Sequence, residues 1–139
     1  MANLNRTLVR ESLDLETYQK DRMVFVGKLT DYNQETKTYK FAFKVEKVIM
    51  RLEMTFKNDK CKIVQIYPDS VTEFTLKMNS KEDYCLILNN SYKLFFVTEA
   101  SLIKYDEKEI KLKYNLYDKN TNQAISINEI SIIGENDIC

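Results

Sequence analysis

Apolar and polar residues alternate with a period of two along most of this chain, and no stretch of similar length shows a helical period. Residues 48–57 and 109–117 are the clearest segments, with apolar side chains at Met50, Leu52 and Met54 in the first and at Leu112 and Tyr114 in the second. Successive side chains of a strand point to opposite faces of a sheet. The pattern therefore predicts strands with one buried and one solvated face.

Short polar segments separate the apolar ones at regular intervals. Asn, Asp, Ser or the single proline gather at 31–35, 58–60, 68–70, 89–91 and 118–123, and such residues favour turns. The spacing predicts eight to ten strands in an all-β sandwich or barrel. Because the links are short, antiparallel up-and-down neighbours are favoured over crossovers. We expect one domain over residues 1–139, in which residues 1–20 fit either a first strand or an irregular segment.

Three positions interrupt the alternation. Gly27 lies inside a strand segment, which predicts a bulge or a sharp bend. Near Lys47 the apolar residues change from odd to even positions, which requires a turn or a bulge. Ile127 and Ile130 differ in phase, so we expect another bulge at Asn128-Glu129.

Composition excludes several classes of chemistry. The 21 basic and 21 acidic residues cancel, so no net field attracts nucleic acid or anionic lipid, and we expect neither as a partner. The chain contains no histidine, which removes histidine-based triads and the commonest metal ligand. Two glycines are too few for a glycine-rich phosphate loop. We expect no enzymatic activity, no metal and no cofactor.

The three cysteines indicate a reducing compartment. Cys61, Cys85 and Cys139 are odd in number and widely spaced, a pattern typical of free thiols rather than a disulfide framework. The first two lie in apolar segments and are expected in the core. With no apolar leader near the N-terminus and no run approaching 18 apolar residues, the expected location is the cytoplasm.

Aromatic residues and methionines form the candidate site. A closed barrel of about eight strands has an interior that is filled by side chains or holds one small molecule. In the first interpretation these residues only fill the barrel. In the second they line a ligand cup, for which the candidate residues are Tyr39, Phe41, Phe43, Met50, Met54, Phe56, Tyr92, Phe96 and Tyr114.

From residue 74 onward the chain resembles the YwiB-like family of uncharacterised bacterial proteins. The resemblance lies in segments 74–78, 92–102, 109–116 and 126–132, which read FTLKM, YKLFFVTEASL, EIKLKYNL and SINEISI. It implies a calycin-like, that is lipocalin-like, barrel. The glycines that the family tends to carry before its middle and long strands are absent from 66–70 and 89–91. Since the family's function is unknown, the resemblance transfers no catalytic residues.

These observations lead to one functional hypothesis and one alternative. The hypothesis is a non-enzymatic module that takes a small apolar or amphipathic ligand into the barrel. The alternative is a protein-interaction or structural barrel with a filled interior, which would bind a protein partner or a second copy through its outer face.

Overall fold

The protein is a closed, ten-stranded antiparallel β-barrel. A computed structural model describes residues 4–89, 91–106 and 108–134. The strands are β1 (Asn5–Asp14), β2 (Lys20–Asn33), β3 (Thr38–Val45), β4 (Val48–Lys57), β5 (Lys60–Tyr67), β6 (Ser70–Lys77), β7 (Lys81–Leu88), β8 (Tyr92–Tyr105), β9 (Glu109–Asp118) and β10 (Ala124–Gly134). The predicted all-β, up-and-down architecture is confirmed, and the N-terminal segment forms the first strand.

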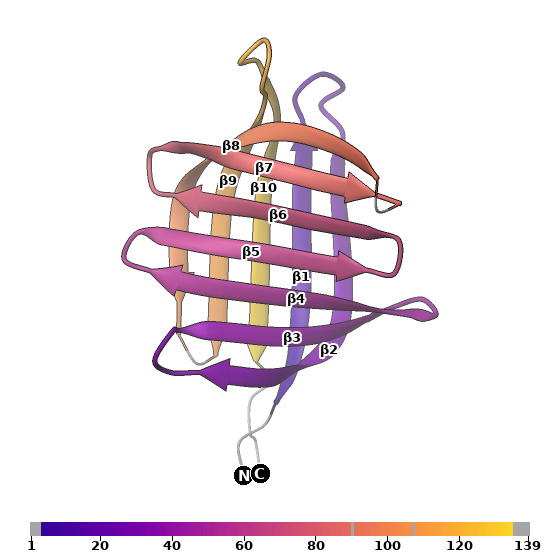
Figure 1. Cartoon of the computed structure of the whole chain (residues 1–139), viewed down its shortest axis with the longest axis vertical. Coiled ribbons are helices and arrows are strands. Elements are labelled where there is room, and N and C mark those ends of the chain that lie inside the picture. The colour runs from indigo at the N-terminus through magenta and orange to yellow at the C-terminus, as the bar shows by residue number, and fades with distance from the viewer. Residues whose placement is uncertain (1–3, 90, 107, 135–139) are drawn as a thin grey trace.

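The barrel closes where the two ends of the chain meet. Every strand pairs with its neighbours in sequence, and β1 pairs with β10 from Arg6↔Gly134 to Asp14↔Ser126. Both termini therefore lie at the same end of the molecule (Figure 1). Closure satisfies the backbone groups that an open sheet would leave at its edges.

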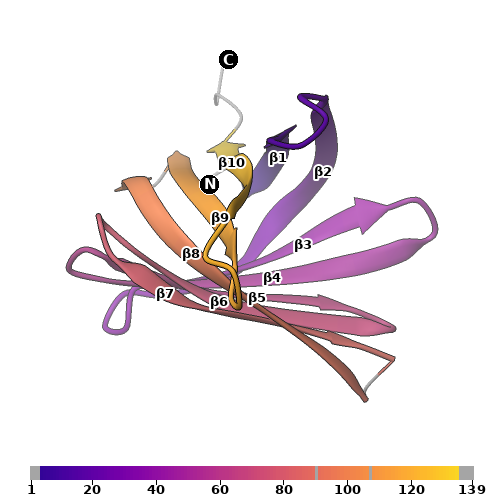
Figure 2. The ribbon, with the colours of Figure 1, turned by 90° about the horizontal axis from the view of Figure 1, so that it is seen from above.

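The barrel is flattened into two layers whose strands cross steeply. Strands β3 to β7 form one layer, and β9, β10 and β1 lie in the other (Figures 1 and 2). The two longest strands, β2 and β8, bend and belong to both layers. The first part of β2 pairs with β1 and the remainder with β3, and the two pairings overlap at Gly27 and Lys28.

Gly27 lies at the bend of β2 because no side chain fits there. A Cβ on this residue would lie 2.1 Å from the carbonyl oxygen of Ala42 and 2.7 Å from the Cα of Phe43. Of the bulge or sharp bend predicted at Gly27, the bend is observed, and the register of β2 with β3 shifts further along, between Leu29 and Asp31. Glycine is thus required here for the close approach of two backbones, which is its other common role in strands.

The remaining phase changes have different causes. The change near Lys47 is absorbed by a two-residue turn, in which Glu46 has a φ of 56°. No bulge occurs at Asn128-Glu129, so that prediction is wrong. The β9–β10 register shifts earlier, between Ala124 and Ser126, and Ile127 is an apolar residue on the outer face.

The core occupies the end of the barrel that holds the termini. Phe43, Met50, Met54 and Leu112 are fully buried there, and burial of each such side chain stabilises the fold by roughly 1.5–3 kcal/mol. Aromatic rings stack through this region, with 4.1 Å between the ring centroids of Phe56 and its neighbour Tyr105. The odd residues of β3 and the even residues of β4 supply most of this core, as their alternation predicts.

The cysteines divide between the two faces. Cys61 is buried in the core as expected, and its burial raises the pKa of the thiol. Cys85 is only half-buried and lies opposite Glu73, on the outer face of β7, so its assignment to the core is wrong. The alternation of the short strand β7 is masked by apolar residues on both faces. Cys139 lies outside the described residues.

Four hairpin turns are capped by a side-chain oxygen. The capping residue either ends the preceding strand or begins the turn. The side-chain oxygens of Asp14, Asn33, Asp106 and Asp118 each accept two backbone N–H bonds of 2.8–3.1 Å from the residues two and three positions on. These hydrogen bonds hold the pKa of the three aspartates below its ordinary value. Asx turns of this kind stabilise tight chain reversals.

Replacement of Gly27 by alanine should destabilise the barrel by roughly 2–3 kcal/mol, because the added Cβ meets backbone that can relax only by moving β3. The matched control is Gly134→Ala, whose Cβ would lie 3.3 Å from the nearest backbone atom and should cost less than about 1 kcal/mol. Urea unfolding monitored by circular dichroism measures both. Equal effects at the two glycines would contradict the close-approach argument.

Stability should decrease in acid partly through the turn aspartates. A carboxyl whose folded pKa lies below its unfolded pKa stabilises the protein fully above the unfolded value, and that contribution is lost as the pH falls through the folded value. Asp14→Asn/Asp118→Asn keeps an acceptor oxygen but removes the titration. Urea unfolding between roughly pH 5 and pH 2 should therefore show a weaker pH dependence in this variant than in the parent. An unchanged pH dependence in Asp14→Asn/Asp118→Asn would contradict this assignment.

Candidate functional site

Most of the predicted ligand residues form the packed core. Tyr39, Phe41, Phe43, Met50, Met54, Phe56 and Tyr114 all have 6% or less of their surface exposed. The space bordered by Tyr39 and Phe41 at the closed end measures about 10 Å³, which is at the lower limit for a single water molecule. These residues are brought together inside the barrel as expected, but they fill this half of it.

Two predicted residues lie toward the opposite end. Phe96 is half-buried on the inner face of β8. Tyr92 shares that face by alternation but is 61% exposed, so its expected burial inside the barrel is wrong. Tyr92 is the first residue of β8 and lies next to the β7–β8 turn.

An arginine bridges the barrel between its two halves. Arg10 follows Leu8 on the inner face of β1, and its Nη1 donates a 3.1 Å hydrogen bond to Oε1 of Gln65 on β5. Strands β1 and β5 are not neighbours in the sheet, so this bond crosses the interior. Both side chains are only partly buried. Solvent therefore reaches part of the inner face at the level of the bridge.

Aromatic rings and hydroxyls surround the bridge. Phe74 stacks on Tyr84 at 4.8 Å and contacts Tyr114 at 5.5 Å, and Tyr84 packs edge-on against Phe96 at 5.6 Å. Burial raises the pKa of both Tyr84 and Tyr114, and the nearby Arg10 partly opposes that shift. The two phenols consequently stay protonated near neutral pH and act as hydrogen-bond donors.

A half-buried apolar wall rises from this floor toward the open end. Leu86 and Leu94 are direct partners across β7 and β8, and Leu116 lies on the same inner face of β9. All three are only partly buried, in contrast to the core residues below them. The inner face here therefore combines the polar Arg10–Gln65 bridge with the apolar side chains of Leu86, Leu94 and Leu116.

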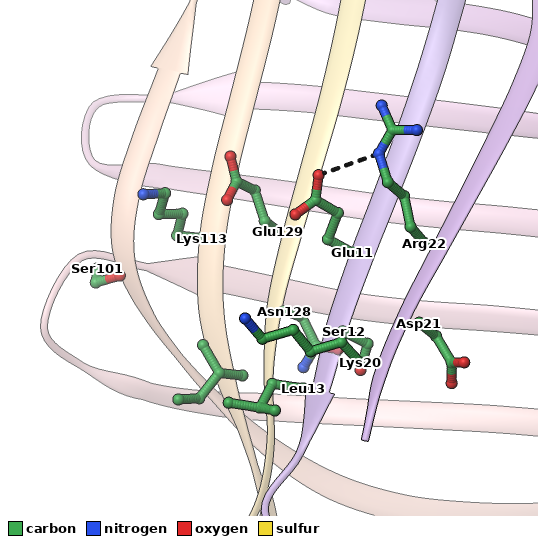
Figure 3. Close-up of a pocket in the computed structure, with 11 residues that line it drawn as sticks. Glu11, Ser12, Leu13, Lys20, Asp21, Arg22, Ser101, Lys113, Asn128 and Glu129 are labelled. Atoms are coloured by element: carbon green, nitrogen blue, oxygen red, sulfur yellow. Dashed lines mark ion pairs between the residues drawn. The ribbon is translucent and has the colours of Figure 1, made fainter. Parts of the chain in front are cut away.

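A separate hollow of about 430 Å³ lies on the outer face of β1, β2, β9 and β10 (Figure 3). Leu13 and Ile127 contribute its apolar surface. Two of its carboxylates form ion pairs, Glu11 with Arg22 at 3.5 Å and Glu129 with Lys111 at 3.3 Å. Charges of both signs, including Lys20, Asp21 and Lys113, line the remainder of the hollow, so it has no uniform charge that selects a ligand.

Other chemistries lack the groups that they need in the described part of the chain. Residues 4–89, 91–106 and 108–134 contain no group of three or more Cys, Asp or Glu side chains placed to hold a metal ion. Within the same residues, no helix has the length and apolar character to cross a membrane. Thr98, the most deeply buried polar residue, donates to the carbonyl oxygen of Thr75 at 2.7 Å and thus joins β8 to β6 structurally.

Sequence reasoning missed the residues of the bridge. Arg10 and Gln65 occupy inward positions of alternating strands, but Val9 and Val64 beside them are apolar as well. The alternation therefore did not show which face of β1 or β5 is buried. The only available signal was that Arg10 lies two residues from Leu8, at the same phase.

These features define the class of the protein as a closed antiparallel β-barrel. Its inner face is fully buried around Phe43 and Met54 and partly exposed at Arg10, Gln65, Leu86, Leu94 and Leu116, and we call the region of these last five residues the open half. No protein-family model matches the sequence, and no curated protein resembles it significantly. The fold is similar to that in the crystal structure of the YwiB protein from Bacillus subtilis, with a TM-score of 0.64 and 8% sequence identity over 96% of this chain and 94% of that chain. The likeness supports a YwiB-like fold and, at this identity, shows the fold alone.

The Arg10–Gln65 bridge should be measurable as a coupling energy. In a double-mutant cycle of Arg10→Met and Gln65→Met, the two residues should couple by about 1 kcal/mol, since each variant removes one partner of a partly buried, charge-assisted hydrogen bond. Urea unfolding of the parent, both single variants and the double variant gives this energy. Strictly additive effects would show that the bond contributes nothing in solution.

Proposed function

We propose that this protein is a non-enzymatic binding barrel that takes a small amphipathic ligand into its open half. The observation that supports this most directly is the half-buried inner wall of Leu86, Leu94 and Leu116 above the Arg10–Gln65 bridge. Ligand sites are typically concave and mostly apolar, with a few polar groups that fix orientation. The open half combines both kinds of surface.

The position of the proposed site differs from that expected from the aromatic residues. The core around Phe43 and Met54 acts as a rigid support beneath it. Of the residues first considered, Phe96 and Tyr114 contribute to the site, at its side and its floor. A site of this kind gains affinity because its walls are already ordered by the barrel.

A binding role fits the available chemistry better than catalysis does. The chain contains no histidine, and Tyr84 and Tyr114 hold their protons more tightly than ordinary tyrosines. Groups of this kind donate hydrogen bonds but do not serve as general bases near neutral pH. We place the protein in the cytoplasm on its free cysteines.

An interaction barrel without a ligand is the second candidate function. Val24, Val26, Ile49 and Ile133 are between 45% and 64% exposed on the outer face, and β-branched residues gathered on a sheet surface favour contact with another protein. This function predicts association in solution, whereas ligand uptake does not require it.

A plugging substitution tests the proposed site. Leu94→Trp adds bulk to the inner wall, while Phe95→Trp places the same side chain at the next residue, which is exposed on the outer face. We expect the amphipathic dye 8-anilinonaphthalene-1-sulfonate to bind the parent with saturable fluorescence. Leu94→Trp should weaken this binding at least tenfold, and Phe95→Trp should leave it unchanged.

The opposite results would support the alternative. Dye binding that is insensitive to Leu94→Trp would place the dye on the outside and remove the support for an internal site. Analytical ultracentrifugation of the same samples then shows whether the parent self-associates. Native mass spectrometry of protein from its own source, compared with the denatured sample, identifies a small molecule released from the barrel.

A further inference from the structure

We infer that Arg10 binds the acidic head group of the ligand, so that the open half of the barrel selects amphipathic carboxylates. This inference rests on the proposed function and specifies the chemistry of the same site. Its basis is Arg10, a cation on the inner face of the barrel whose hydrogen-bond partners are neutral.

The guanidinium of Arg10 lacks a counter-ion. Its hydrogen bonds go to neutral groups, the amide oxygen of Gln65 and the phenol oxygen of Tyr114. Among the described residues, no carboxylate oxygen lies within 4.0 Å of its nitrogens. Taking a cation out of water is costly unless a charged partner replaces the hydration. An anionic ligand supplies that partner at a position where the protein does not.

The groups around Arg10 are donors that complement an acceptor-only ligand. Tyr84 and Tyr114 hold phenolic protons near it, and Thr72 is close enough to Tyr84 for their hydroxyls to interact. A carboxylate accepts several hydrogen bonds and donates none. Arginine in addition offers two parallel N–H groups that fit both oxygens of one carboxylate. An ammonium head group would meet the arginine and these donors with no acceptor of opposite charge.

The acidic residues of the inner face lie elsewhere. Asp14 is at the rim, where its carboxylate already accepts the backbone N–H bonds of its turn. Asp21 is exposed and pairs across the strands with Ser12, nearer the rim than Arg10. Glu82 lies beyond Tyr84 on β7, and its Oε1 is 3.8 Å from Nζ of Lys60. Asp118, at the same rim on β9, likewise accepts the backbone N–H bonds of its turn. None of these carboxylates forms an ion pair with Arg10, so its charge is left for an anionic ligand.

The orientation of the ligand follows from this placement. The carboxylate enters first and replaces Gln65 on the guanidinium, and the apolar part lies along Leu86, Leu94 and Leu116 toward the turns. The neutral amide of Gln65 is suited to this exchange because it can release the arginine without leaving a buried charge.

Two probes with the same alkyl tail separate the contribution of the head group to affinity from that of the tail. Octanoate and 1-octanol are titrated into the parent, Arg10→Met, Gln65→Glu and the outer-face control Arg51→Met by isothermal calorimetry. Arg10→Met removes the cation and keeps the stem of the side chain. Gln65→Glu is close to isosteric and supplies an internal carboxylate to Arg10, so it tests the same point if Arg10→Met does not fold.

We expect the parent to bind octanoate at least tenfold more tightly than 1-octanol. Arg10→Met and Gln65→Glu should each weaken the binding of octanoate at least tenfold, while the affinity for 1-octanol changes less than threefold. Arg51→Met should change neither affinity. If folded Arg10→Met and Gln65→Glu bind octanoate as the parent does, the head-group assignment is wrong although the barrel still takes ligands. If neither probe binds the parent, or Leu94→Trp does not affect them, the proposed function itself fails.

Discussion

The pairing of β1 with β10 is the constraint on which the rest of this structure depends. It joins the two ends of the chain and turns ten hairpin-connected strands into a closed surface with an inside and an outside. Each inward side chain then has a fixed set of opposite neighbours, so alternation along one strand becomes packing across the barrel. Without this closure Arg10 would lie on an open sheet and not within reach of Gln65 on the opposite wall.

The way the barrel flattens divides its interior into two environments. Sharp bends in β2 and β8 bring the two layers together, and one of them is possible only because Gly27 lets the backbones of β2 and β3 approach closely. At the end near the termini, rings and sulfur-containing side chains fill the space completely. Toward the other end, inward residues such as Leu86, Leu94 and Leu116 remain partly exposed. A single fold thus combines a packed core with an inner surface that solvent reaches.

The charge inside the barrel differs from the charges on its surface. The chain as a whole is neutral, and several surface charges form ion pairs, as in the 3.0 Å contact of Lys62 with Glu73. Such exposed pairs contribute little to stability. Arg10 differs because its partners are the neutral side chains of Gln65 and Tyr114. A net charge of zero therefore does not describe the electrostatic field inside the barrel.

Strand alternation is local and is repeated in nearly every segment, so the fold class could be predicted from the sequence. It located Tyr39, Phe41 and Phe43 on one face and Leu112 with Tyr114 on another, and these faces are buried. It did not determine where Tyr92 ends up, whether Cys85 faces inward, or why Gly27 is needed, since each depends on the end of a strand or on a neighbouring layer. Alternation specifies that two faces exist, whereas contacts across the barrel set how deeply each inward residue is buried. The hydrogen bond between Arg10 and Gln65 joins residues 55 positions apart in the chain, and no local pattern records it.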